Sequence, residues 1–167
     1  MPILPRRRRG YRAPRDLRGY RKDLDERTGK IDQEISELVD VVDALRRRAT
    51  DIDEAILRLE AGEDQLDAAA AEMRDLVAPE ELHALHAEYE ANLERALRGI
   101  VTAERGCGIT RQPHRPPDDE EPMIYWKRGH LNLLHAQLRM RELVPVMLTW
   151  EPGRPAEATV SARVRRA

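Results

Sequence analysis

Apolar residues recur at alternating steps of four and three positions between residues 31 and 77. This spacing is the heptad repeat, which keeps one seam of an α-helix facing a partner over many turns. Only Glu63 interrupts the seam, and the neighbouring Gly62 costs about 1 kcal/mol in a helix interior relative to alanine. The pattern therefore predicts a single long helix over about residues 28–77, with a weak point at these two residues.

Two shorter helices are predicted downstream, over about residues 79–105 and 120–144. Proline at a first helical position followed by acidic residues is typical of a helix start, whereas glycine after an apolar run is typical of a helix end. A proline inside the pattern is expected to stop a helix because it lacks the N–H group. The residues expected to separate or end the helices are Pro79, Gly106, Gly108 and Pro145.

The last segment, residues 146–167, has two readings. Val160, Ala162 and Val164 alternate with polar residues, which favours a small β-hairpin, and the basic end equally suits a tail. The expected fold class is all-α, with two shorter helices packed on a long heptad-patterned helix and this hairpin as an addition. The helical bundle or coiled coil is expected to occupy residues 23–145.

The predicted long helix is expected to expose part of its seam. At 1.5 Å per residue it would be roughly 75 Å long, and each shorter helix about half of that. Two such helices beside its C-terminal half would leave the N-terminal half uncovered, and an exposed apolar seam needs a partner. The simplest partner is a second copy of the chain. The residues predicted to form this self-association seam are Ile31, Ile35, Leu38, Val42, Leu45, Ile52, Ile56 and Leu59.

The composition agrees with long helices, because 36% of the residues are charged, only 4% are aromatic and phenylalanine is absent. The single cysteine excludes an intramolecular disulfide and a cysteine-rich zinc site. No stretch approaches the roughly 18 apolar residues of a membrane span, and no signal peptide is visible, so we expect a cytoplasmic protein.

Charge is segregated along the chain. Residues 1–30 hold eleven basic and four acidic residues, whereas residues 31–104 hold seven basic and twenty acidic ones. Residues 1–22, with nine basic residues and three prolines, are expected to form an extended arm. Tyr11 and Tyr20 lie between the charges and would suit stacking on bases. The arm's predicted contacts for an acidic partner or nucleic acid are Arg6, Arg7, Arg8, Arg9, Arg12, Arg15, Arg18, Arg21 and Lys22.

The start of the second predicted helix carries a carboxylate–histidine pair, Glu80 and His83, at the three-residue spacing used in di-iron helical bundles. Such a site needs a second pair from another helix, and the third predicted helix has histidines without a glutamate at that spacing. We therefore expect neither a metal nor another cofactor here. The cluster considered is His83, His86 and Glu90, and the third helix offers His130 and His135.

Cys107 lies between two glycines and is the one candidate nucleophile of its type. A catalytic thiol needs a base and an orienting group, and only its position makes His114 a candidate base. We expect no catalytic residues in this chain. The large aromatic side chains Tyr125, Trp126 and Trp150 are expected to pack in the core.

These features favour a non-enzymatic coiled-coil scaffold or adaptor that self-associates and presents its basic arm to an acidic partner. The arm leaves three other targets open, namely nucleic acid, a membrane surface and the protein's own acidic middle. The alternative function is therefore sequence-nonspecific nucleic-acid binding. A metal-dependent bundle enzyme is the third reading.

Overall fold

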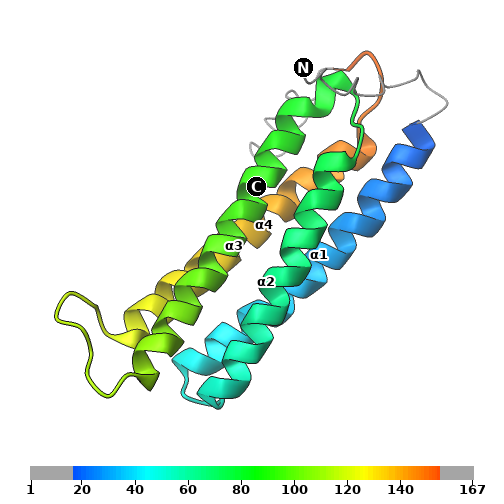
Figure 1. Ribbon diagram of the computed structural model, residues 1–167. Helices are drawn as coiled ribbons and strands as arrows, with labels where there is room; N and C mark the ends of the chain where they lie inside the picture. The colour runs from blue at the N-terminus through cyan, green and yellow to red at the C-terminus, as the bar shows by residue number, and fades with distance from the viewer. Residues whose placement is uncertain (1–16, 155–167) are drawn as a thin grey trace, which may run out of the picture.

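The computed structural model describes residues 17–154, which fold into an elongated bundle of α-helices lying side by side (Figure 1). No strand occurs among these residues. None of the helices they form has the length and apolar character needed to cross a membrane. The elements are α1 (Leu17–Arg46), α2 (Ile52–Asp75), the 3₁₀-helix η2 (Glu80–Leu82), α3 (His83–Arg111) and α4 (Pro122–Thr149).

The predicted long helix is two helices, because the chain reverses direction at residues 47–51. Arg48 has a positive φ of 55°, and Asp51 is the N-cap of α2. The Asp51 carboxylate accepts hydrogen bonds from the backbone N–H groups of Asp53 and Glu54 at 2.9 and 3.2 Å. These bonds satisfy two of the N–H groups that a helix start leaves unpaired, so they favour a new helix here over continuation of the old one.

The reversal places α2 antiparallel to α1, and together with α3 and α4 it covers the predicted seam (Figure 1). The expectation that the shorter helices leave half of the seam exposed is therefore wrong. Ile52 and Ile56 are half-buried and pack against the core. The other six seam residues are each at most 2% exposed: Ile31, Ile35, Leu38, Val42, Leu45 and Leu59.

Helices α3 and α4 pack through small residues. A Cβ atom added to Gly129 would lie 2.7 Å from the backbone oxygen of Gly99, which no real Cβ contact allows. Gly106 similarly faces Trp126, where a Cβ would lie 2.8 Å from the indole nitrogen. The prediction that Gly106 and Gly108 end the helix is wrong, because Gly106 is a packing position and α3 continues to Arg111.

Helix α4 runs through Pro145 to Thr149, so the predicted stop is wrong as well. The hairpin expected within residues 146–167 is also wrong for residues 146–149, which are helical, and Val146 and Met147 are buried in the core. Burial of this last turn offsets the cost of an internal proline. The remainder of the proposed hairpin, residues 155–167, lies outside the described residues.

Candidate functional site

The described part of the basic arm is helical, because α1 already includes residues 17–22. Tyr20 is 4% exposed, and its hydroxyl lies 2.5 Å from Nε2 of His86 on α3. A buried phenol offers no face to a nucleotide base, so the stacking role predicted for Tyr20 is wrong. Tyr11 lies outside the described residues.

The three described arm cations differ in their surroundings. Arg21 donates a hydrogen bond from its guanidinium to the backbone carbonyl of Trp150, at the end of α4. Arg18 and Lys22 are exposed and lie four residues apart, on one side of α1. The start of α1 is thus joined to α3 and α4 at one end of the bundle, with two cations facing solvent. The arm residues outside the described range are Arg6, Arg7, Arg8, Arg9, Arg12 and Arg15.

His86 is 5% exposed, and no described residue forms a hydrogen bond with its Nδ1 atom. Burial lowers the pKa of this imidazole to about 4, and the nearby charge of His83 acts in the same direction. The ring is therefore neutral at pH 7. The Nε2 atom of His83 lies 3.1 Å from the backbone carbonyl oxygen of Ala78. Across the described range, no three His, Cys, Asp or Glu side chains come together in a way that could hold a metal ion.

The opposite end of α3 carries Cys107, whose thiol is fully buried beside Trp126. Burial raises the pKa of this thiol, which lowers the fraction of reactive thiolate. One turn away, burial raises the pKa of Glu104 to about 7, with further contributions from the charges of Glu63 and Glu60. Both groups belong to the packing between helices.

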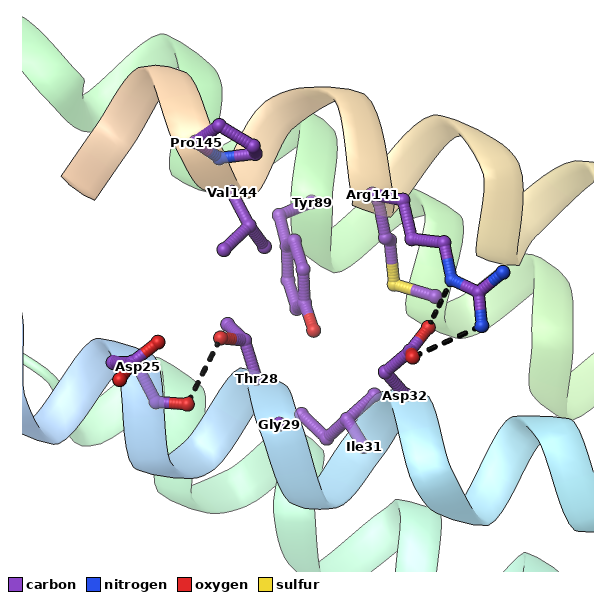
Figure 2. Close-up of a pocket in the computed structure, with 10 residues that line it drawn as sticks. Asp25, Thr28, Gly29, Ile31, Asp32, Tyr89, Arg141, Val144 and Pro145 are labelled. Atoms are coloured by element: carbon purple, nitrogen blue, oxygen red, sulfur yellow. Dashed lines mark hydrogen bonds and ion pairs between the residues drawn. The ribbon is translucent and has the colours of Figure 1, made fainter. Parts of the chain in front are cut away.

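A cavity of about 220 Å³ lies between α1 and α4, with Tyr89 of α3 at its floor (Figure 2). Its apolar wall comes from the Tyr89 ring and from Ile31, Met140, Val144 and Pro145. Its polar groups come mainly from one side of α1, where Asp25 and Asp32 are seven residues apart. The complete lining is Asp25, Thr28, Gly29, Ile31, Asp32, Tyr89, Met140, Arg141, Val144 and Pro145.

The two ends of the cavity differ in charge. Asp32 accepts hydrogen bonds from Nε and Nη2 of Arg141 at 2.7 and 3.0 Å, and also from the side-chain amide of Gln137. Asp25, at the other end, is exposed and forms no ion pair with any described residue. Between them, Thr28 donates its hydroxyl hydrogen to the carbonyl of Leu24 at 2.8 Å. The lining residues thus hold two carboxylates and one guanidinium, and Arg21 and Lys22 lie one helical turn before Asp25 on α1.

The hydroxyl of Tyr89 points between Thr28 and Asp32 in Figure 2. Tyr89 is only 1% exposed, so its ring belongs to the core and only the region of its hydroxyl borders the cavity. Burial raises the pKa of this phenol well above its ordinary value, and the charge of Asp32 acts in the same direction. The group is therefore a permanent hydrogen-bond donor that faces the cavity.

The sequence reasoning missed this cavity. Two signals were present, namely a proline inside an otherwise helical pattern and Asp25 and Asp32 at a seven-residue spacing. A proline in a helix interior removes an N–H group and often accompanies a local opening. Neither signal shows that α1 lies beside α4, more than 100 residues away.

Comparison of the chain with protein-family models, with curated proteins and with solved structures finds no match in any of the three. The function is therefore argued from the residues themselves.

Proposed function

We propose that this protein is a non-enzymatic adaptor that presents its basic N-terminal segment to an acidic partner. The observation that carries the proposal is the anchoring of the start of α1. Tyr20 and Arg21 attach this end to α3 and α4, while Arg18 and Lys22 remain exposed. A partner that meets these cations meets a preorganised surface, which lowers the entropic cost of binding.

The charge distribution supports an acidic partner. Nine basic residues and one acidic residue occupy positions 1–22, so several negative groups can be neutralised together. Clustered charge of one sign speeds association with the opposite sign and makes affinity depend on salt. The outer face of α2 is acidic, which makes the protein's own surface a competitor for the same cations.

The self-association that belongs to this proposal needs a surface other than the buried seam. Exposed apolar residues at seven-residue spacing lie along one side of α4, and they support this helix as the contact. Their exposed fractions are 37%, 51% and 56%, for Ile124, Leu131 and Leu138 respectively.

Sequence-nonspecific binding of nucleic acid is the second candidate. Exposed cations one helical turn apart, as in Arg18 and Lys22, suit contacts with adjacent phosphates. Burial of Tyr20 removes one stacking platform, so any such binding would rest on phosphates alone.

One titration compares the two candidates. Fluorescence anisotropy would follow full-length protein binding to labelled duplex DNA and to a labelled polyglutamate peptide, at about 0.05 and 0.15 M salt. We expect the peptide to bind and the affinity to fall at the higher salt. Substituting Arg18→Gln with Lys22→Gln should weaken binding several-fold, and removing residues 1–16 should abolish it.

The matched control is Arg74→Gln with Lys127→Gln, which removes one exposed arginine and one exposed lysine elsewhere. This control should bind like the wild type. DNA binding with a salt slope reduced by about 0.9 per lost phosphate contact would favour the second candidate. Equal affinity with and without residues 1–16 would contradict both.

A further inference from the structure

We propose that the loop between α3 and α4 binds a second protein, one whose binding groove is lined by aromatic side chains and bordered by a carboxylate. The binding segment is residues 112–118, with Pro113 and Pro116 seated against the aromatic rings. Figure 1 shows this loop projecting from the end of the bundle opposite the start of α1. The loop and the basic N-terminal segment are therefore separate surfaces, and either proposal can fail without the other.

The connection between α3 and α4 is the longest one in the described part of the chain. It spans residues 112–121, whereas α1 and α2 are joined by residues 47–51 and α2 and η2 by residues 76–79. Helix connections in bundles usually take about 2–8 residues, and loops are where binding residues concentrate. Every residue from 111 to 118 is exposed. The loop is thus longer than the reversal of the chain needs, and its middle takes no part in packing.

Both ends of the exposed segment are tied to the bundle by arginine–carboxylate pairs. At the first end, Nε of Arg111 donates to the Asp53 carboxylate of α2 at 2.8 Å. At the other end, the Asp119 carboxylate accepts hydrogen bonds from Nη2 of Arg105 at 2.6 Å and from the Tyr125 hydroxyl at 3.3 Å. Fixed ends limit the conformations of the residues between them, so binding this segment costs less conformational entropy.

The middle of the segment keeps its own groups free for a partner. Pro113, His114 and Arg115 form no hydrogen bond or ion pair with any other described residue. After them, the carbonyl of Pro116 accepts a hydrogen bond from the Asp119 amide at 3.1 Å, which closes a turn. Pro117 is the second residue of this turn, a position that suits the fixed φ of proline. Pro117 therefore has a structural role that Pro113 lacks.

Proline rings supply the apolar surface of the segment, because its other side chains are all polar or charged. Pro113 and Pro116 are three residues apart, and a polyproline helix has three residues per turn, so both rings would lie on one edge. Gln112 already has the extended backbone of such a helix, with φ −79° and ψ 134°. Residues 113 and 114 bend in the free protein and would extend on binding. Domains that recognise paired prolines at this spacing hold them in grooves lined by aromatic rings.

The charge of the segment specifies the border of the partner's groove. Arg115 is exposed and, unlike Arg105 and Arg111, has no carboxylate partner in the described range. A guanidinium between two seated prolines favours a groove with a carboxylate at its edge, since hydrogen bonds between charged groups are the stronger ones. This requirement distinguishes the expected partner from an aromatic groove with a basic border.

Binding would be measured by isothermal titration calorimetry between the full-length protein and a panel of purified SH3 domains, which present aromatic-lined grooves to paired prolines. NMR of the ¹⁵N-labelled full-length protein would locate the contact. We expect at least one domain of the panel to bind and the shifted amide signals to belong to residues 110–121. No binding by any domain, or shifts elsewhere, would overturn the proposal.

Substitutions separate the paired prolines from the third one. Pro113→Ala with Pro116→Ala should weaken binding by about ten-fold or more. Pro117→Ala is the matched control, because it removes a neighbouring ring that belongs to the turn, and it should bind within about two-fold of the wild type. Both variants change exposed residues, so neither should lower the thermal midpoint. An equal loss in the two variants would contradict the assignment.

Arg115→Gln tests the charge. It should weaken binding several-fold and make the remaining affinity less dependent on salt. Duplex DNA is the contrasting probe. DNA binding that is lost in Arg115→Gln and kept in the double proline variant would assign the segment to phosphates and overturn the proposal.

A second pair of prolines at the same spacing provides the last control. Pro2 and Pro5 are also three residues apart, and they lie outside the described residues. Pro2→Ala with Pro5→Ala therefore makes the same change in the basic N-terminal segment. This variant should bind the SH3 domain like the wild type. Loss of binding here, with the loop variants unaffected, would place the contact on the N-terminal segment instead.

Discussion

The α1–α2 pair and the α3–α4 pair are both antiparallel. Side chains fill the space between the helices of the first pair, whereas backbone atoms meet in the second. Between α1 and α2 the contact is made by long side chains, and Gly62 on α2 receives the end of the Leu38 side chain. Between α3 and α4 the backbones themselves meet, with Gly99 and Gly129 opposite each other. The first pair is held apart by flexible groups, and the second by rigid ones.

The difference decides how each pair responds to added volume. The end of a leucine side chain moves by rotation about its χ angles, so a neighbouring methyl group can be accommodated. A backbone carbonyl in a helix moves only with the helix, so a methyl group beside it must separate the two axes. The α1–α2 pair should therefore tolerate an added methyl group at its glycine, whereas the α3–α4 pair should not.

The largest expected effect comes from Leu38→Asp in the side-chain-packed pair. Leu38 is fully buried, so the change loses a leucine's burial and places a carboxylate in the core. The combined cost should exceed about 3 kcal/mol of unfolding free energy, measured by urea denaturation. Leu57→Asp, at a residue 68% exposed on α2, is the control and should stay within about 0.5 kcal/mol of the wild type.

The same variant separates burial within one chain from burial between two copies. Loss of helical circular dichroism at all protein concentrations is expected when Leu38 belongs to the core of a single chain. Retained helicity with a halved mass in sedimentation equilibrium would show instead that Leu38 lies between copies, contrary to this prediction.

The second effect compares Gly129→Ala with Gly62→Ala. Both changes gain helix propensity worth about 1 kcal/mol. At Gly129 the new methyl group meets the Gly99 carbonyl, so we expect a net loss of about 1–3 kcal/mol in unfolding free energy. At Gly62 it meets only the Leu38 side-chain end and the Glu34 side chain, and the result should lie within about 1 kcal/mol of the wild type.

Gly108→Ala provides the reference for propensity alone, because a Cβ there meets nothing within 4 Å. It should be more stable than the wild type by up to about 1 kcal/mol in the same urea measurement. An equal loss at Gly129 and Gly62 would show that the two helix pairs do not differ in this respect.

The contrast also explains how much of the fold could be predicted from the sequence. Leucines and isoleucines at periodic positions indicate side-chain packing, so the apolar face of α1 and α2 could be predicted from the sequence. The glycines of α3 and α4 allow backbone contact, which leaves no hydrophobic pattern in the sequence. Gly106 was therefore interpreted as a helix end. Whether a glycine ends a helix or packs against another helix depends on what faces it. Gly106 faces Trp126 of α4, and the local sequence around Gly106 does not show this neighbour.

The sequence contains a local signal for the turn between α1 and α2, but the continuous heptad repeat favoured the prediction of one long helix. Asp51 followed by Asp53 and Glu54 is typical of a helix N-terminus, and the structure uses it as one. The apolar spacing continues through the turn, however, because both helices face the same core. The cavity was less predictable, since it requires α4 to continue past Pro145 and to lie beside α1.

A pH-dependent effect of at most intermediate size arises where the two pairs meet, at the Tyr20–His86 contact between α1 and α3. The folded state holds the pKa of His86 at about 4, below its ordinary value of 6.5, so the unfolded chain binds more protons between these values. Stability is therefore fully present above pH 6.5 and is lost as the pH falls toward 4. The loss should reach up to about 2 kcal/mol at pH 5.

Glu104 opposes this trend from the far end of α3. Its pKa is raised to about 7 from an ordinary 4.5, so the folded state binds more protons in that range and stability rises as the pH falls. Its partial exposure makes the effect smaller than the pKa alone suggests. The Glu104→Gln background removes it, and urea denaturation at pH 5 and 7.5 should then show the His86 loss undiminished. Adding His86→Gln, which keeps a polar side chain without a titrating ring, should flatten the profile. A profile that stays equally steep would mean that another group causes the acid instability.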